Sequence, residues 1–562
     1  MEIVILVLLF VVLYLWVKTR KLEKEITRRN DEYQKELSDL QNEHEVTLKE
    51  KNEAILRTLF LEGKVQMLQK SLAEAEKAVD FYKNITEASG DLNSSADAAE
   101  SKQLIDIATE QIKTTRSKQN DGPVDVSSFL DREQLFACNE MENGNQNFFI
   151  TGKAGTGKSF LLDVFRKTTS KSHVVLAPTG IAALNVNGVT LHSTFGYYNL
   201  VNLDVDVISE KTIRLKSEKA IILRRVSTII IDEISMVRAD TFDKIDRILK
   251  AVNNNDKPFG GKQVFLFGDL FQLPPVVKRN EYEYLYDKYG GIYFFCSEAF
   301  RKGNFRFVEL TINHRQKDDA DYFALLNRIR DGSATSRDLD LLNTRVVKDE
   351  SMYDRFTTLL PTKAEVEKVN QYHMDHLRSQ LFTYHAEVVL DKKPNENRNL
   401  EAIFPIVTRL QLKKGALVMM VANDIDHRWV NGTLGIVAGL TEKGISVAID
   451  KRVYEIHRTE FTEQEITYVN GRIVYEDVYK VLQYPVVPAY AITIHKSQGQ
   501  TYKNIVCDID KCFASGQAYV ALSRCASLEG MHLKRKVSSA SIQVDRAVLD
   551  FYQSNIKSET KL

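Results

Sequence analysis

The sequence has little that would suggest a disulfide-bonded or zinc-binding protein. Its five cysteines are odd in number and lack the paired spacing of a zinc site or a disulfide framework. We interpret them as small apolar core residues in a reducing compartment. An excess of basic charge is also missing, because 76 Lys and Arg balance 76 Asp and Glu. A chain without net basic charge must bind any nucleic acid through a local groove.

One uncharged hydrophobic run stands at the N-terminus. Residues 3–17 (IVILVLLFVVLYLWV) would form a helix of about 22 Å at roughly 1.5 Å per residue. Lys18, Arg20 and Lys21 follow it, which favours a single-pass membrane anchor over residues 1–17 with the remaining chain in the cytoplasm. A cleaved signal peptide is the alternative, but the acidic start and missing cleavage site argue against it.

Residues 18–87 are rich in Lys, Glu, Gln and Leu, and their apolar positions mostly recur at helical spacing. This pattern predicts a coiled-coil stalk through which the chain would self-associate. Because the heptad is imperfect, a single long helix is the alternative, and the oligomeric state stays open. Residues 88–128 turn to Ser, Ala, Asp, Thr and Lys, which predicts a flexible linker.

A phosphate-binding loop is expected at residues 152–159. An apolar run at residues 148–150 leads into the pattern G-x-x-x-x-G-K-S, and a helical pattern follows. Backbone N–H groups of such a loop bind phosphates at a helix N-terminus. Lys158 is expected to reach the β- and γ-phosphates of ATP, and Ser159 to hold Mg²⁺. The residues expected to contact the nucleotide are Gly152, Ala154, Gly155, Thr156, Gly157, Lys158 and Ser159.

Polar residues follow two further apolar strand patterns. Asp232 and Glu233 come after residues 228–231, and Gln272 follows residues 263–267. We expect Asp232 to complete the Mg²⁺ site and Glu233 to act as the general base on the attacking water. Gln272 is the candidate for sensing the γ-phosphate. Alternating strands and helices with polar residues at strand ends predict a doubly wound α/β domain.

From residue 129 to the C-terminus, the chain resembles the PIF (petite integration frequency) DNA helicases of superfamily 1, relatives of the RecD-type helicases. The motifs that carry the resemblance are residues 130–134, 152–159, 177–183 with 191–195, 232–237 with 242–245, 268–274, 310–316, 491–501 and 519–524. The resemblance implies two RecA-like domains with parallel sheets, at residues 129–308 and 309–562. It also implies that Gln134 contacts adenine and that Arg315 and Arg524 of the second domain face the ATP.

The resemblance further implies a nucleic-acid path across both domains. Residues implied to contact the strand are Thr179, His192, Ser193 and Phe195 in the first domain and Thr493, His495 and Lys496 in the second. A wedge that splits the duplex is expected at residues 196–216. Alternating runs at about 441–484, with Asn470-Gly471 as a hairpin turn, resemble the small β-barrel insertion of these helicases, although a capping hairpin is the alternative.

The activity implied is that of an ATP- and Mg²⁺-dependent DNA helicase. It would move 5′→3′ on single-stranded DNA and unwind duplex and forked DNA in replication, repair or recombination. A membrane anchor is not part of the family's pattern. The alternatives are a P-loop translocase that acts on RNA, and a membrane-tethered nucleic-acid clamp that does not unwind.

Overall fold

The computed structural model of the chain describes residues 130–315, 319–392, 399–424, 426, 428–450, 452–469 and 472–556. The predicted anchor (1–17), stalk (18–87) and linker (88–128) lie outside this part. Within the described residues, none of the helices has the length and apolar character needed to cross a membrane. The chain from Arg132 onward forms a compact unit of its own.

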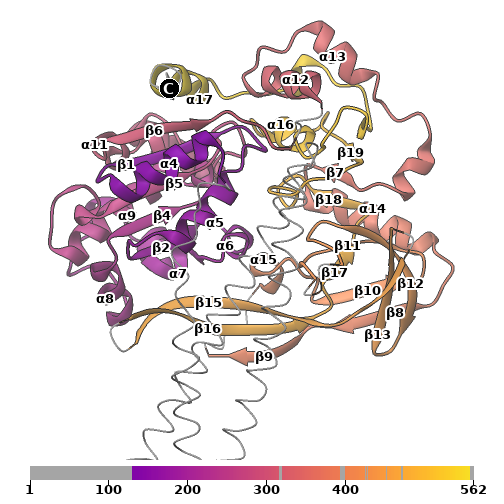
Figure 1. Cartoon of the computed structure of the whole chain (residues 1–562), viewed down its shortest axis with the longest axis horizontal. Coiled ribbons are helices and arrows are strands. Elements are labelled where there is room, and N and C mark those ends of the chain that lie inside the picture. The colour runs from indigo at the N-terminus through magenta and orange to yellow at the C-terminus, as the bar shows by residue number, and fades with distance from the viewer. Residues whose placement is uncertain are drawn as a thin grey trace, which may run out of the picture. The chain divides into compact units, whose positions relative to one another are not determined.

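The first half of this unit is built on a six-stranded parallel sheet with the order β3-β2-β4-β5-β1-β6. The strands are β1 (Asn147–Gly152), β2 (His173–Ala177), β3 (Val189–Thr190), β4 (Thr228–Ile231), β5 (Gln263–Phe267) and β6 (Phe305–Leu310). Their apolar runs are buried, as expected for parallel strands covered on both faces. Figure 1 shows the helices packed around these strands. They are α4 (Arg132–Asn143), α5 (Lys158–Thr168), α6 (Gly180–Asn185), α7 (Leu191–Phe195), α8 (Ser217–Arg225), α9 (Ala239–Asn253), α10 (Tyr282–Tyr289) and α11 (Glu298–Lys302).

Strand β6 corrects the predicted domain boundary at residues 308 and 309. It pairs with β1 along its whole length, from Asn147 opposite Phe305 to Gly152 opposite Leu310. The first domain therefore extends through Leu310, and the predicted boundary fell inside one of its own strands.

The second domain contains a four-stranded parallel sheet with the order β18-β7-β19-β20. Its strands are β7 (Thr358–Leu360), β18 (Ala491–Thr493), β19 (Ile505–Cys507) and β20 (Met531–Leu533). Helices in this half are α12 (Ala320–Arg330), α13 (Ser336–Asn343), α14 (Lys363–His376), α15 (Leu400–Ile403) and α16 (Gln517–Leu522). The α/β class with two parallel sheets agrees with the prediction.

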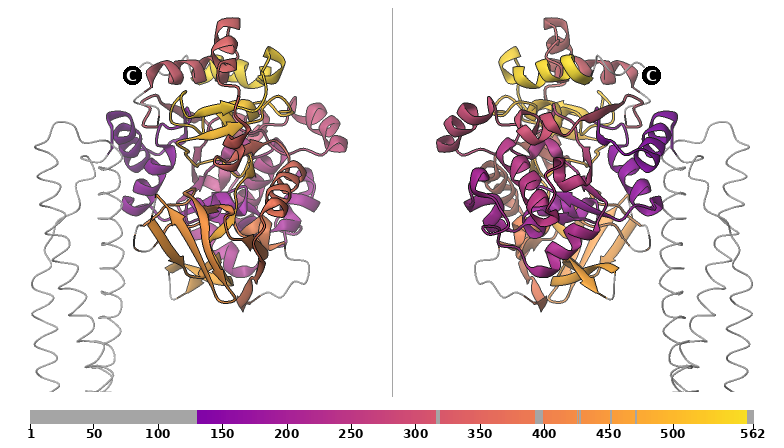
Figure 2. Two further views of the ribbon diagram at one scale, coloured as in Figure 1. Left: turned by 90° about the vertical axis from the view of Figure 1, so that its right-hand side faces the viewer. Right: turned by 90° about the vertical axis from the view of Figure 1, so that its left-hand side faces the viewer.

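A β-rich insertion lies between β7 and β18, and it is larger than predicted. It contains β8 (Leu381–His385), β9 (Glu387–Asp391), β10 (Arg409–Lys413), β11 (Leu417–Met420), β12 (Leu434–Thr441), β13 (Gly444–Ile449), β14 (Arg452–Ile456), β15 (Thr459–Val469), β16 (Arg472–Gln483) and β17 (Val486–Pro488). The range 441–484 therefore covers little more than β13 to β16. Val469 pairs with Arg472 on the two strands that flank the predicted turn, and the turn residues 470 and 471 lie outside the described part. Figure 2 shows these orange strands gathered at one end of the unit.

The C-terminal segment returns to the first domain. Helix α17 (Arg546–Phe551) and the following π-helical turn, Tyr552–Ile556, lie beside β6 in Figure 1. The ring of Phe551 stacks on Phe295, with centroids 4.3 Å apart, and the Tyr552 hydroxyl donates to Glu309 at 2.7 Å. The last described residues of the predicted second domain, 309–562, thus pack against the first domain.

Candidate functional site

The phosphate-binding loop joins β1 to α5 as predicted. Gly157 precedes the helix with φ 78°, in the left-handed region, and a Cβ there would lie 2.3 Å from Nε2 of Gln134. Only glycine fits this position without strain. Because the loop ends where α5 begins, the N–H groups of the first helical turn lie next to it. This arrangement binds phosphates.

The side chain of Lys158, the first residue of α5, folds back onto the preceding loop. Its ammonium group donates to the carbonyl oxygens of Gly152 at 2.7 Å and Lys153 at 3.1 Å. Burial lowers the pKa of Lys158, and the carboxylates of Asp269 and Glu233 oppose that shift. Ser159, the next residue, is exposed.

Asp232 and Glu233 stand at the end of β4 beside this lysine. Burial raises the pKa of Asp232 to about 6 and, together with the neighbouring Asp232 charge, raises the pKa of Glu233 to about 8. Glu233 has φ 50°, which is uncommon for a residue with a side chain. Strained backbone of this kind concentrates at functional sites, where the surrounding structure holds it.

Gln272 and Gln498 link these acids to the second domain. The Gln498 amide donates to Oε2 of Glu233 at 2.9 Å and to Oε1 of Gln272 at 3.1 Å. Gln272 in turn donates to Asp269 at 3.3 Å. The structure thus brings the predicted γ-phosphate sensor and the predicted base into one network. Sequence reasoning missed Gln498 as a site residue, although it lies within the motif at residues 491–501.

The segment after β6 lies along the phosphate loop. Asn313 donates to the carbonyl of Ala154 at 3.0 Å, and the backbone N–H of His314 donates to the carbonyl of Gly155 at 2.8 Å. These contacts fix the position of Arg315. Its guanidinium donates to the carbonyl of Ser523 at 3.0 Å, and burial together with the Arg524 charge lowers its pKa.

Arg524 follows α16 and is 2% exposed. It donates from Nε to the Val520 carbonyl at 2.8 Å and from Nη2 to Oγ of Ser523 at 2.9 Å. Burial lowers the pKa of Arg524, and the negative charge of Glu233 acts in the opposite direction. Arg315 and Arg524 are therefore neighbours, and Arg524 lies within electrostatic reach of Glu233.

Gln134 lies against the phosphate loop, where its amide donates to the carbonyl of Thr156 at 3.3 Å. Contact with adenine stays a prediction for this residue. Asp232 and Ser159 fit a magnesium site, since Mg²⁺ is usually held by one or two protein oxygens with phosphates and water as further ligands. In the described ranges no group of three or more His, Cys, Asp or Glu could hold a metal ion by itself.

The predicted nucleic-acid residues of the first domain lie on α6 and α7. Thr179 caps α6 and accepts from the N–H of Ala182, while the Ser193 hydroxyl donates to the Thr190 carbonyl. The prediction that Phe195 contacts the strand is wrong, because this residue has no exposed surface and belongs to the core. The short helix α7 points this ring inward. The exposed ring nearby is Tyr197, at 64% exposed, whose centroid lies 5.6 Å from that of His192.

The predicted residues of the second domain lie at and after the end of β18. Thr493 is the last residue of the strand, and its hydroxyl accepts from the N–H of Lys496 at 3.2 Å. His495 and Lys496 are exposed. These positions leave their side chains accessible to a nucleic-acid strand.

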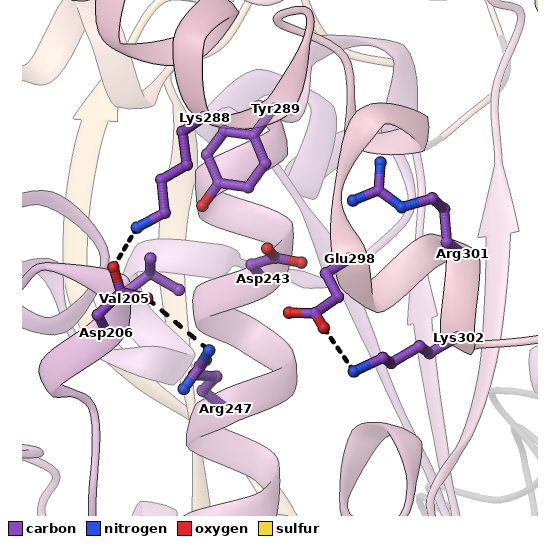
Figure 3. Close-up of a pocket in the computed structure, with 9 residues that line it drawn as sticks. All are labelled: Val205, Asp206, Asp243, Arg247, Lys288, Tyr289, Glu298, Arg301 and Lys302. Carbon is purple, nitrogen blue, oxygen red and sulfur yellow. Dashed lines mark hydrogen bonds and ion pairs between the residues drawn. The ribbon is translucent and has the colours of Figure 1, made fainter.

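A separate cavity of about 310 Å³ lies in the first domain, between α9, α10 and α11 (Figure 3). Four basic and three acidic side chains line it, and some of them form ion pairs. Lys288 binds Asp206, and Lys302 binds Glu298. None of the predicted site residues lines it, so it is distinct from the phosphate loop.

The sequence of this chain is similar to those of known DNA helicases. The profile of the PIF1-like helicase family matches residues 130–340. The chain is 34% identical over 430 residues to the ATP-dependent DNA helicase Pif1 of Bdellovibrio bacteriovorus, and the match covers 75% of this chain and 92% of that protein. It is 32% identical to the human ATP-dependent DNA helicase PIF1, with 75% of this chain and 63% of the human protein covered.

Solved structures are similar in both fold and sequence. The crystal structure of Bacteroides sp Pif1 in complex with ADP-AlF4 superposes with a TM-score of 0.70 at 39% identity, and the match covers 77% of this chain and 98% of that one. The structure of Bacteroides Pif1 bound to ssDNA has a TM-score of 0.55 at 38% identity, with 76% of this chain and 97% of that one covered. The chain therefore belongs to the family of PIF1-like helicases.

Proposed function

We propose that this ATP-dependent DNA helicase moves 5′→3′ along single-stranded DNA and unwinds duplexes at forks. The observation that carries the proposal is the shared site. The first domain supplies Lys158 and Glu233, and the second supplies Gln498 and Arg524 within the same network. The positive charge of Arg524 would stabilise the transition state only when the two domains meet. ATP hydrolysis would therefore be coupled to the relative motion of the domains. The Bacteroides relatives solved with single-stranded and forked DNA support the substrate.

ATP and Mg²⁺ fit the loop and the acids. Backbone N–H groups of residues 155–159 would hold the phosphates, and Asp232 with Ser159 would hold the metal. Bound magnesium supplies charge neutralisation on the phosphates. Glu233 would accept a proton from the attacking water, and Gln272 would sense the γ-phosphate.

The strand would cross both domains. Thr179, His192 and Ser193 would contact it in the first domain, and Thr493, His495 and Lys496 in the second. Tyr197 takes the place that Phe195 cannot fill, because an exposed aromatic ring can stack on a base. The wedge would lie within residues 196–216, which include Tyr197.

Strand displacement on 5′-tailed and 3′-tailed duplexes tests this function. The wild-type chain should unwind the 5′-tailed duplex only, and Lys158→Ala should lower the rate at least about 100-fold, because the lysine contacts the transferred phosphoryl group. Preference for the 3′ tail would contradict the polarity. Undiminished unwinding by Lys158→Ala would contradict the assigned ATP site.

We further propose that residues 1–17 anchor the chain in a membrane, with the motor on the cytoplasmic side, and that residues 18–87 allow self-association. The support is the hydrophobic run, the basic residues after it and the helical spacing of the stalk. Such a tether would confine DNA replication, repair or recombination to a membrane surface. If a chain lacking residues 1–21 still sediments with membranes, the anchor is wrong. Analytical ultracentrifugation of the chain with and without residues 18–87 tests the stalk. If the chain self-associates and the shortened chain forms the same oligomer, the stalk assignment is wrong.

A further inference from the structure

Helix α16 begins in direct backbone contact with the first domain. Gly516, which precedes it, has φ 75°, and a Cβ there would lie 2.3 Å from the Phe271 carbonyl and 2.4 Å from the Gln272 carbonyl. The chain can approach this closely only at glycine. The helix that leads into Arg524 is thus seated on the loop that carries Gln272.

Tyr519, in the middle of α16, makes two hydrogen bonds to the first domain. Its hydroxyl accepts from the N–H of Ala154 in the phosphate loop at 2.9 Å and donates to Oδ2 of Asp269 at 3.4 Å. The ring is 3% exposed. Neither contact is needed to build α16 itself, and both cross from one domain to the other.

Asp269 is a fixed acceptor for this hydroxyl. It is fully buried, and its Oδ1 accepts from Nη2 of Arg330 at 3.1 Å and from Nε at 3.3 Å. Arg330 is 3% exposed, and its guanidinium lies over the Phe271 ring at 4.1 Å. Burial would raise the pKa of Asp269, but the Arg330 and Lys158 charges outweigh it and hold the pKa below its usual value. A carboxylate that stays charged and immobile gives the tyrosine a defined orientation.

We propose that Tyr519 is a positioning residue that couples the phosphate loop to Arg524. The inference rests on the proposed ATPase function and extends it to a residue outside the predicted phosphate-binding and metal-binding set. Tyr519 holds α16 at the phosphate loop and Asp269, and Arg524 folds back onto α16 through the Val520 carbonyl. The hydroxyl therefore sets where the guanidinium stands relative to the nucleotide. Arg330 and Asp269 keep this contact in place.

Tyr519→Phe removes only the hydroxyl. Because Arg524 acts on the transition state, kcat for single-stranded-DNA-stimulated ATP hydrolysis should fall about tenfold, which corresponds to about 1.4 kcal/mol. The KM for ATP should change less than about twofold, since the variant keeps the contacts that bind ATP equally in the ground state and the transition state. Asp269→Asn should lower kcat in the same direction, and the double variant should lose less than the product of the two single losses, because both act on one contact.

Tyr322→Phe is the matched control. Tyr322 is also fully buried, and its hydroxyl donates to the Leu522 carbonyl of the same helix at 2.7 Å, without contact to the phosphate loop. It should lose a similar amount of thermal stability and keep kcat within about twofold. Equal kcat losses in the two variants, or none in Tyr519→Phe, would overturn the positioning role. A wild-type chain without DNA-stimulated ATPase would instead overturn the proposed function.

Discussion

Phe195 and Tyr197 are two residues apart but differ in exposure, so their substitutions should have different effects. Phe195 is fully buried, and Phe195→Ala should lower the free energy of unfolding by about 3–5 kcal/mol through lost burial and a cavity. Tyr197→Ala should leave unfolding unchanged and weaken single-stranded DNA binding by about 1–3 kcal/mol through a lost stacking contact. Denaturant titration and fluorescence anisotropy measure the two quantities. Weakened binding in a fully folded Phe195→Ala variant would contradict this assignment.

Arg524 should not be replaceable by lysine. Its planar guanidinium donates to separate acceptors on Val520 and Ser523, which a single ammonium group cannot match. Arg524→Lys should therefore lower kcat for ATP hydrolysis about 10³-fold, the range seen when such arginines are lost. Nucleotide binding, measured with a fluorescent ATP analogue, should remain. A variant with wild-type kcat would show that this arginine does not act on the nucleotide.

The residues predicted from local patterns came together because each follows a strand of one parallel sheet. Lys158, Asp232 and Gln272 follow β1, β4 and β5, which are neighbours in that sheet. The predicted nucleic-acid contact of Phe195 was wrong because a motif gives a residue's place in the chain but not the direction of its side chain. Arg330 was missed because its partner Asp269 is 61 residues away, and no local pattern marks such an ion pair.

At the level of whole elements, α17 is expected to stabilise the first domain. Phe551 contacts Phe295, Phe300 and Phe307. At about 0.5–1.5 kcal/mol for each aromatic pair, Phe551→Ala should lower the free energy of unfolding by about 2 kcal/mol or more. Arg546→Ala, on the same helix but 93% exposed, is the control and should change it by less than about 0.5 kcal/mol. Equal values for the two variants would mean that α17 does not stabilise the domain in solution.

Strands β1, β4 and β5 could be predicted one at a time, since each contains a short, buried apolar run. The limits of the insertion could not. Strand β9 pairs with β16, and β8 pairs with β10, so the sheets join segments that are distant in the sequence. The hairpin β15–β16 was found because its two strands are adjacent along the chain. The return of α17 to the first domain likewise depends on contacts with aromatic rings some 250 residues earlier.

At the scale of the whole molecule, the motor should work without the first 128 residues. The matched region is 75% of this chain but 92% of the Bdellovibrio protein, so a relative consists almost entirely of this part. The residues from Arg132 onward also form their own compact unit. A fragment of residues 129–562 should therefore keep DNA-stimulated kcat within about twofold of the full chain, as expected for a domain with its own core. The full chain assayed in detergent is the reference, and a folded fragment with much lower kcat would show that the N-terminal residues contribute to catalysis.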